Sequence, residues 1–511
     1  MSAPSTPDEP GDLRSALNWF HTWFGLFLGG LMFVIFWTGT LAVFDREIDR
    51  WMMPDTRLSE APPLKVDSLV PLVRKLAPDA VQWRIMLPDE RTPVLELQAS
   101  LSDGTYVSRM VDPATLRVLP DQGTYGGTEF FYPYHFRLNI GAVGLFICAF
   151  AAVVMLALCI SGVIVHRKIF ADFFTLRIVR KPQRTTLDLH NLTGVLTLPF
   201  LLMISFTGVA IFTYTYLPSA QSLLFSRDPS ALAGGYFSRD AAGRPGGKLV
   251  SLDALLDRAA THWETERPRY VQVIHAGDAN AYIEIRPPSS RTISKSTAAI
   301  WYDAASGKLL GVSPATGTRK FYDFIYGIHL IQFDHWALRW LYFLSGLAGS
   351  ILIATGMLFW IQSRRKRHAK MGKRGVRLAE ATSIAFTTGL LLASLGFMIV
   401  NRILPSGLAG RADVEVQMFH LVWIAATLHA AIRGGAAWRE QTWLIAGGCL
   451  LAVVLNALTT PHPLTSSIRQ GLWQIAGVDL VLLASAAIAV IVALKLGRFS
   501  GGAKFSKLIG V

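Results

Sequence analysis

The sequence predicts a multi-pass α-helical membrane protein with about eight transmembrane helices and two small α+β domains outside the membrane. The composition is apolar, with 51% hydrophobic and 16% charged residues among 511. Apolar runs of about 20 residues, the length that crosses a bilayer, recur along the whole chain. Two long, more polar segments with alternating hydrophobicity separate some of these runs, as expected of small sheets.

The eight apolar runs are expected to be helices because they are continuous, whereas barrel strands alternate. The first run follows a short N-terminus, residues 1–16. It is too long for a signal-peptide core and lacks a small-x-small cleavage site, so we expect it to remain as an anchor. We place the spans at 17–44, 138–165, 190–217, 337–361, 380–403, 413–432, 441–459 and 473–495, the last four within a C-terminal region 380–496 before a tail at 497–511.

Two strongly basic connections, 166–189 and 362–379, set the expected orientation. Lysine and arginine accumulate in the cytoplasmic loops of membrane proteins, so both chain termini are expected to be cytoplasmic. The net charge of +14 is therefore mainly a topology signal, and no nucleic-acid partner is expected. The basic residues of the two connections are Arg167, Lys168, Arg177, Arg180, Lys181, Arg184, Arg364, Arg365, Lys366, Arg367, Lys370, Lys373, Arg374 and Arg377.

The two polar segments, 45–137 and 218–336, resemble each other and face away from the cytoplasm in this topology. Each opens with a helical pattern, at Ser68 and at Ser251. Each is then expected to form a small antiparallel sheet closed by a tight turn. In the first turn Leu116 stands where a glycine is expected. The strand-like stretches are 94–97 and 281–285, and the turns are 111–115 and 302–307.

Four histidines of the apolar segments occur in two sequence patterns, here called frames, and each frame is present twice. In one frame a histidine lies 18 residues before the glycine of a Thr-Gly pair, and in the other 27 residues before the glycine of a Ser-Gly or Thr-Gly pair. The first frame contains His21 with Gly39 and His190 with Gly208, and the second contains His135 with Gly162 and His329 with Gly356.

Imidazoles at membrane depth are costly, and a functional role is their default interpretation. Pairing the equivalent residues gives two bis-histidine sites that could each hold a haem iron: His21 with His190 near the cytoplasmic face, and His135 with His329 near the outer face. The alternative is that these histidines are structural and bond to backbone. Any haem would be of b type and non-covalent, two per chain, because no Cys-x-x-Cys-His motif occurs.

Other histidines leave alternatives open. His166 could replace an inner ligand, bind a haem propionate, or be an interfacial polar residue. His335, beside Asp334, is a less favoured outer ligand. His420 and His429, with His462, could line a third site, for instance for quinone, although structural roles are favoured. Arg137, Arg319 and Lys320 could pair with propionates or act as interfacial anchors.

A helix–domain–helix unit repeated twice, with Asp-x-x-(Thr/Ser)-Gly-like turns, resembles the PepSY-associated transmembrane family over about residues 14–370. Within it the chain is similar to the FoxB-type ferrisiderophore reductases, which are di-haem proteins of the bacterial inner membrane. The resemblance implies two PepSY-like periplasmic domains and a ferric-siderophore substrate.

The functional hypothesis is transmembrane electron transfer that reduces a periplasmic ferric chelate. Reduction releases the iron, because hard oxygen ligands bind iron(II) less well than iron(III). The chain has no Gly-x-Gly-x-x-Gly motif between a strand and a helix. The expected donor is therefore a membrane quinol, which the last four helices could serve, or a separate cytoplasmic reductase. The alternatives are a non-catalytic protein that binds or regulates a periplasmic partner, and a transporter in which Asp479 and Asn456 line a path.

Overall fold

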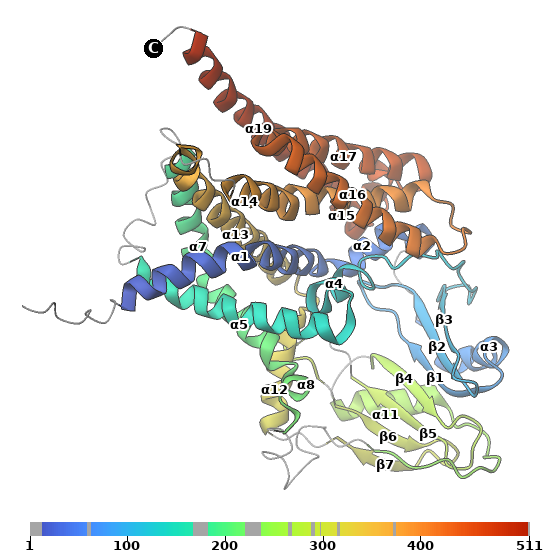
Figure 1. Ribbon diagram of the computed structural model, residues 1–511. Coiled ribbons are helices and arrows are strands. Elements are labelled where there is room, and N and C mark those ends of the chain that lie inside the picture. The colour runs from blue at the N-terminus through green and yellow to red at the C-terminus, as the bar shows by residue number, and fades with distance from the viewer. Residues whose placement is uncertain are drawn as a thin grey trace, which may run out of the picture.

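The structure is a computed structural model in which long helices form a bundle and a β-sheet covers one end (Figure 1). The first described residues of α1 (Leu13–Ala42) and the end of α19 (Trp473–Leu508) lie at the opposite end of the bundle. The structure describes residues 13–58, 63–166, 182–219, 237–263, 268–287, 292–296, 298–313, 317–370 and 375–508.

The prediction of a multi-pass helical protein is confirmed. Among the described residues, seven helices are long and apolar enough to cross a membrane, and one of these covers the 49 residues Arg411–Thr459. A straight helix of that length would measure about 74 Å, against about 30 Å for the hydrocarbon core. The chain instead reverses at η4 (Gly434–Ala436), where Gly434 has a φ of +55°. This reversal gives the eight predicted spans.

The spans form two groups of helices. The first group also contains α5 (Gly141–Val165), α7 (Pro182–Ala210) and α13 (Trp336–Lys370), which pack with α1 as a four-helix unit, here called the histidine bundle. The second group is α14 (Gly375–Ile384), the π-helical η3 (Ala385–Gly389), α15 (Leu390–Ile403), α16 (Arg411–Arg433), α17 (Ala437–Thr459), the short α18 (Leu464–Arg469) and α19.

Local packing joins these two groups. The π-helical turn η3 presents Phe386 to α1, where a Cβ on Gly30 would lie only 2.7 Å from the Phe386 ring. A single π-helical turn in a long helix shifts the direction of its side chains. The glycine and the displaced aromatic ring together allow close packing between the bundle and the C-terminal helices.

The two polar segments form one continuous sheet rather than two separate ones. All neighbouring strands are antiparallel, and the order β3-β2-β1-β4-β5-β6-β7 joins the segments through β1 and β4. The strands are β1 (Ala80–Met86), β2 (Leu95–Leu101), β3 (Tyr106–Val111), β4 (Tyr270–Ile274), β5 (Tyr282–Arg286), β6 (Ile300–Asp303) and β7 (Leu309–Val312).

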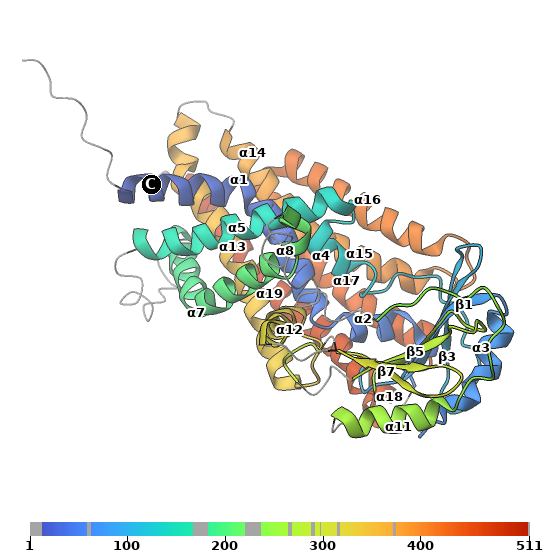
Figure 2. The same cartoon turned by 90° about the horizontal axis from the view of Figure 1, so that it is seen from below.

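The helices of the two segments also share a core. η2 (Val66–Leu69), α3 (Val70–Leu76) and α11 (Leu252–Trp263) bury their apolar side chains in one cluster with the strands. Figure 2 shows α3 and α11 at the margin of the molecule, with strands between them and the bundle. Each segment therefore supplies the expected helix and antiparallel strands, but the two segments fold as halves of one layer.

Two aspartates tie these halves together reciprocally. The backbone N–H groups of Val66 and Asp67 donate to the Asp253 carboxylate at 2.9 and 3.0 Å. In return, the Leu252 N–H donates to the Asp67 carboxylate at 2.7 Å, and so does the Ser251 hydroxyl, at 2.5 Å. Each carboxylate therefore satisfies the N–H groups at the start of the other half's helix, where an anion is favourable.

The two predicted turns have the same geometry despite their different sequences. Leu116 donates its N–H to the Asp112 carbonyl at 2.9 Å, as Gly307 does to Asp303 at 2.9 Å. Both residues have left-handed φ values, +56° for Leu116 and +69° for Gly307. Leu116 thus adopts a conformation that favours glycine, which is an unfavourable choice for a leucine.

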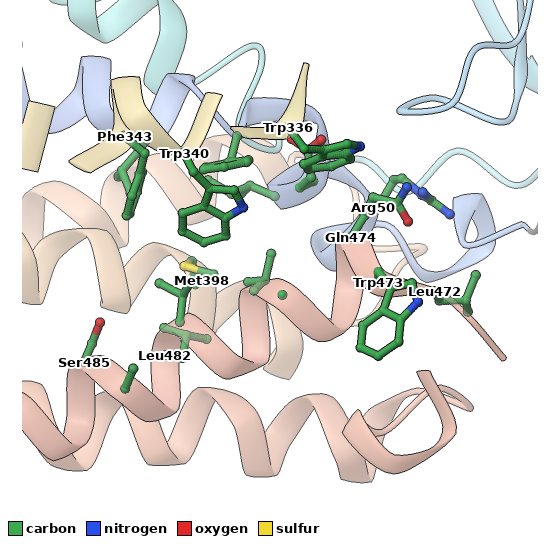
Figure 3. Close-up of a pocket in the computed structure, with 18 of the residues that line it drawn as sticks. Arg50, Trp336, Trp340, Phe343, Met398, Leu472, Trp473, Gln474, Leu482 and Ser485 are labelled. Atoms are coloured by element: carbon green, nitrogen blue, oxygen red, sulfur yellow. The ribbon is translucent and has the colours of Figure 1, made fainter. Parts of the chain in front are cut away.

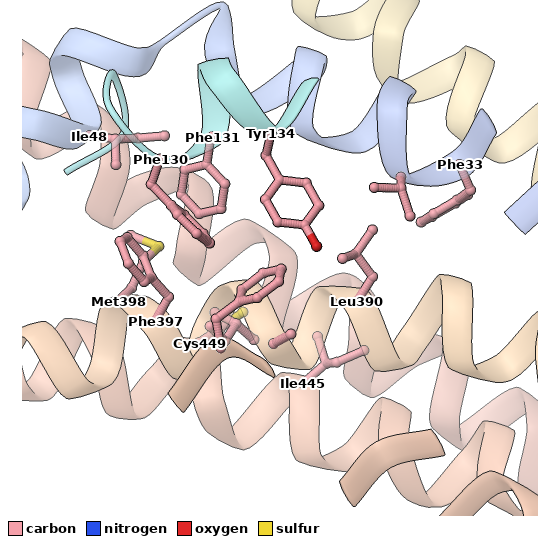
Figure 4. Close-up of a cluster of buried hydrophobic side chains, with 14 of the residues drawn as sticks. Phe33, Ile48, Phe130, Phe131, Tyr134, Leu390, Phe397, Met398, Ile445 and Cys449 are labelled. Carbon is pink, nitrogen blue, oxygen red and sulfur yellow. The ribbon is translucent and has the colours of Figure 1, made fainter. Parts of the chain in front are cut away.

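The short helix α4 (Phe131–Arg137) is attached to the C-terminal helices by aromatic packing (Figure 4). Phe130, Phe131 and Tyr134 are buried, and the Phe130 ring stacks on Phe397 of α15 with centroids 4.3 Å apart. His135 follows Tyr134 and contacts α1 instead. The aromatic side chains therefore fix the position of the α4 histidine.

The two polar residues suggested for a transport path, Asp479 and Asn456, instead form hydrogen bonds between helices. Asp479 and Asn456 are 1% and 0% exposed, and Asn456 donates to Asp479 at 3.0 Å. Trp51 of α2 (Asp45–Met52) donates its indole N–H to Asp479 at 2.8 Å. Arg57, which follows the short η1 (Pro54–Thr56), donates to Asn456 at 2.7 Å. These contacts attach the α2 segment to α17 and α19.

Candidate functional site

The structure brings the four repeated histidines together in two pairs. The rings of His21 on α1 and His190 on α7 have centroids 6.5 Å apart and planes at 81°. The rings of His135 on α4 and His329 on α12 (Gly317–Leu330) have centroids 6.1 Å apart and planes at 27°. We call the first the inner pair and the second, nearer the sheet, the outer pair. The pairing of equivalent positions matches the one expected from the internal repeat.

The outer histidines lie on separate short helices and not at the starts of the spans. Leu138, Asn139 and Ile331 have positive φ values of 51°, 54° and 56°, and they turn the chain between these short helices and α5 or α13. Each outer histidine thus precedes a left-handed turn, which directs its ring back into the bundle. The spans expected at 138–165 and 337–361 also begin after His135 and His329, but the short helices that carry these residues were not expected.

The Nδ1 atoms of three of the rings face backbone carbonyl oxygens of neighbouring helices. A carbonyl oxygen only accepts a hydrogen bond, so Nδ1 carries a proton, and in the neutral imidazole Nε2 then keeps its lone pair. The acceptors are Ile35 for His135 at 2.8 Å, Leu352 for His190 at 2.9 Å and Leu158 for His21 at 3.2 Å.

His329 reaches the same protonation state through a hydroxyl. Its Nδ1 lies 2.9 Å from Thr207 Oγ1, and that hydroxyl donates its proton to the Met203 carbonyl at 2.8 Å. The hydroxyl must therefore accept the bond from His329. Within the described part of the chain, none of the four Nε2 atoms has a hydrogen-bond partner. Four neutral rings with a fixed Nδ1–H and an open Nε2 are arranged as metal-ligating histidines commonly are.

Each glycine of the repeated frames lies against one of the histidine rings. A Cβ on Gly39 would be 2.6 Å from His135, and one on Gly208 would be 2.9 Å from His329. At the inner pair the corresponding distances are 3.2 Å from Gly162 to His21 and 3.0 Å from Gly356 to His190. The glycine that follows a histidine of one pair in the sequence therefore receives a histidine of the other pair. Its missing side chain lets the ring reach the backbone.

Replacing Gly39 by alanine is expected to weaken binding of the haem that the sequence predicts at the outer pair by about 10–100-fold, the range found when a ligand's supporting contacts are lost. The new Cβ would displace the His135 ring from its bond with Ile35. The measurement is the cofactor content of the purified variant. Gly447→Ala is the matched control, since a Cβ there has nothing within 4 Å. Equal content in both variants would contradict this role for the glycine.

Both pairs face cavities with mostly apolar walls. The inner cavity, of about 250 Å³, is lined by His21, His190 and also His166. The outer cavity, of about 190 Å³, is lined by His135 and His329. Each cavity has one buried amide oxygen that lacks a hydrogen-bond partner in the described part of the chain: Asn191 Oδ1 in the inner cavity and Gln332 Oε1 in the outer one. Buried polar atoms normally have partners, so each of these oxygens can accept a hydrogen bond from a donor group in its cavity, such as water.

The distances within the pairs suit two imidazoles on opposite sides of one metal ion. With a nitrogen–metal length of about 2.0–2.1 Å and a ring centre about 1.2 Å behind each nitrogen, the two ring centres would be about 6.4 Å apart. The observed separations are 6.5 and 6.1 Å. Within the described residues no group of three or more His, Cys, Asp or Glu side chains could hold a metal.

The remaining histidines lie apart from the outer pair and from each other. His335 is exposed and is not among the residues lining the outer cavity. His420 is exposed and bonds to the Val416 carbonyl of its own helix, while His429 pairs with Glu440 at 3.0 Å. His462 lies in the loop after α17. His420, His429 and His462 therefore do not converge on a common third site.

The cation that lines the outer cavity is Arg46, which sequence reasoning missed. Arg46 pairs with Asp89 at 2.8 Å and remains partly exposed. Arg137 is exposed beside the Phe136 ring, and Arg319 forms an ion pair with Asp323 at 3.2 Å. Neither Arg137, Arg319 nor Lys320 lines the outer cavity.

The sequence also matches a known family. Residues 18–363 match the PepSY-associated TM region family. The chain belongs to this family. The PepSY-associated region covers both histidine pairs, their glycines and the sheet, and it ends within α13. Helices α14 to α19 follow the matched region, as expected from the extent of the resemblance.

A relative of this PepSY-associated protein is an uncharacterized protein of Pseudomonas aeruginosa. The two are 27% identical over 380 residues, which cover 70% of this chain and 91% of the relative. The similarity therefore extends over nearly the whole of the relative.

Proposed function

We propose that this protein is a haem-b-containing reductase of the bacterial inner membrane, similar to FoxB-type proteins, that passes electrons across the membrane to a periplasmic ferric siderophore and releases iron(II). The observation that carries this proposal is the geometry of the two pairs. Ring centres 6.5 and 6.1 Å apart, a bonded Nδ1 and an open Nε2 in each ring suit axial ligation of two haem groups.

The residues present fit a non-covalent haem at each pair. His21 and His190 would ligate the inner iron, and His135 and His329 the outer iron, while His166 lines the inner cavity as an alternative ligand or propionate partner. When bound, haem supplies one-electron redox chemistry. The protein fixes the imidazoles and surrounds them with mostly apolar walls. All three cysteines are free and buried, which suits non-covalent attachment.

The proposed orientation rests on the basic connections. It places the chain termini and the inner pair at the cytoplasmic face, and the sheet and the outer pair in the periplasm. Part of the charge lies outside the described residues, namely Arg167, Lys168, Arg177, Arg180, Lys181, Lys373 and Arg374, as does the N-terminus before residue 13. Arg184, which is described, pairs with Asp188 at 2.9 Å.

A cluster of cations lies between the sheet and the outer pair and is suited to an anionic chelate. The Lys295 ammonium lies 4.7 Å from the ring centre of Tyr326, one helical turn before His329. Burial, together with repulsion from the nearby guanidinium groups of Arg269, Arg46 and Arg286, lowers the pKa of Lys295 to about 7. A bound anion would relieve this repulsion.

Binding of an anionic ferric chelate is expected to tighten as the pH falls from 8 to 6. The free protein holds the Lys295 proton weakly, and an anion raises that pKa, so binding takes up a proton. The dissociation constant should change by up to about tenfold per pH unit above pH 7. The measurement is calorimetric titration with ferric citrate. Lys295→Met should lose this pH dependence, and an unchanged dependence in that variant would assign the proton to another group.

The experiment that tests the proposed function is a visible spectrum of the detergent-purified protein, oxidised and then reduced with dithionite. A Soret shift, a b-type α-band and about two haem groups per chain are expected. Reduction of a ferric chelate by the dithionite-reduced protein should follow. A protein that stays colourless when expressed with ample haem would favour a non-catalytic PepSY protein that binds a periplasmic partner.

A further inference from the structure

A third cavity, of about 1500 Å³, lies between the histidine bundle and the C-terminal helices (Figure 3). We call it the lateral cavity. Residues of α1 and α13 line one side, and residues of α15, α17 and α19 line the other. Residues of α2 and of the β1–β2 connection line its outer end. It exceeds the range of about 300–1,000 Å³ that is usual for small-molecule sites.

The lining suits a long apolar molecule with a flat polar ring. Trp336, Trp340 and Phe343 of α13 face the cavity on one side, opposite residues of α19 (Figure 3). Aromatic rings stack well on other flat rings. The wall also carries the hydroxyls of Ser394 and Ser485. Ser394 accepts the Trp37 indole N–H at 3.0 Å, which keeps a polar pair within this apolar wall.

The rim of the lateral cavity opens on the outer surface of the helices. Leu344, Trp473 and Ile488 line it and are 55%, 61% and 62% exposed. Apolar side chains that are exposed on spanning helices face lipid. A ligand can therefore enter from the bilayer without crossing water.

The lateral cavity and the outer-pair cavity lie on two sides of the same helices. On α1, Trp37 and Leu41 face the lateral cavity, whereas Gly39 and Thr40 face the outer-pair cavity. On α13, Phe343 faces the first cavity and Tyr342 the second. One helix, about 10 Å in diameter, thus separates a lipid-accessible cavity from the histidines of the outer pair.

We propose that the lateral cavity binds a membrane quinol, which serves as electron donor. The role as donor rests on the proposed function, whereas the binding site does not. Oxidation of one quinol to quinone releases two electrons and two protons. The electrons reduce two ferric ions to ferrous ions in two chelates, and the protons leave at the outer mouth, where the exposed carboxylate of Glu90 lines the cavity. A phospholipid would fill the apolar length but has no flat ring for the α13 aromatics.

The test fills the cavity at a glycine. Gly477 lines the lateral cavity, and a Cβ there would meet nothing within 4 Å. Gly477→Leu should therefore fold normally and obstruct the cavity. Gly447→Leu is the control, because Gly447 is also unobstructed but is exposed on the outside of α17 and does not line the cavity. Both changes replace glycine by a better helix former.

Binding of decylubiquinone to the detergent-purified full chain is measured by isothermal titration, and bound lipids are identified by native mass spectrometry. We expect one quinone per chain, at least about tenfold weaker binding in Gly477→Leu, and unchanged binding in Gly447→Leu. Equal binding in the two variants would overturn the proposal, as would a phospholipid that quinone does not displace. Haem content is measured separately: a haem-loaded protein without quinone binding refutes only this site, and a colourless protein that binds quinone refutes only the proposed function.

Discussion

Replacing either histidine of the outer pair by alanine is expected to remove one haem group per chain and to reduce ferric-chelate reduction to the background rate. His135 and His329 are the two imidazoles with open Nε2 atoms in the outer cavity. One remaining imidazole cannot hold a six-coordinate haem iron on both faces. The haem content should fall from about two groups per chain to about one, measured by the pyridine haemochrome spectrum.

The inner pair is an internal control for folding in this experiment. A correctly folded His329→Ala protein is expected to keep the haem proposed between His21 and His190, and its reduced spectrum should retain one b-type band. The reciprocal variant His190→Ala should lose the other band. His335→Ala is a matched control, because His335 is exposed six residues after His329 in the sequence and does not line the outer cavity. Full haem content in both His135→Ala and His329→Ala would refute this assignment of ligands.

A conservative substitution distinguishes a histidine that ligates iron from one that only packs against its neighbours. Methionine can bind haem iron and raises the reduction potential relative to histidine. His329→Met should therefore keep the outer haem with a higher potential. If the histidines only packed against backbone, methionine and alanine would affect stability without a spectroscopic change at one site.

Much of this site could be predicted because an internal duplication relates its parts. Equivalent positions in two helix–domain–helix units occupy equivalent depths, so His21 pairs with His190 and His135 with His329. The packing of each glycine on a ring was not predicted. A signal for it was present, because a serine or threonine precedes each of these glycines, and the hydroxyl of Thr207 bonds to His329.

Other features could not be read from the sequence because they depend on long-range packing. The pairing of β1 with β4 joins distant residues, such as Trp83 and Val273, which are 190 positions apart, and no local pattern specifies such a register. The left-handed turns after the outer histidines use leucine and isoleucine, which do not indicate such a conformation, beside one asparagine, which adopts it more readily. The lateral cavity arises from the way two groups of helices pack, and neither group encodes it alone.

Removing the Glu47 carboxylate is expected to cost about 3–5 kcal/mol of stability, as for other broken buried ion pairs. Arg91 donates two bonds to Glu47, at 2.9 and 2.8 Å, and Arg339 approaches it at 3.3 Å. The side chains of Arg91, Glu47 and Arg339 are only 3%, 3% and 0% exposed. Glu47→Ala would therefore leave two buried guanidinium groups without their main counter-ion.

The expected loss is measured as a lower midpoint of thermal unfolding in detergent, with Asp89→Ala as the control. Asp89 pairs with Arg46 at a partly exposed site, where an ion pair contributes about 0–1 kcal/mol.

Burial acts to raise the pKa of Glu47, but hydrogen bonding and electrostatic attraction from Arg91, with a contribution from Arg339, leave that pKa below its usual value. The stabilisation is therefore present at neutral pH and is lost as the pH falls through that lowered pKa. A similar midpoint for Glu47→Ala and Asp89→Ala would mean that water or rearranged side chains compensate the two arginines. The large effect is expected because Glu47 joins three parts of the molecule: α2 itself, the β1–β2 connection through Arg91, and α13 through Arg339.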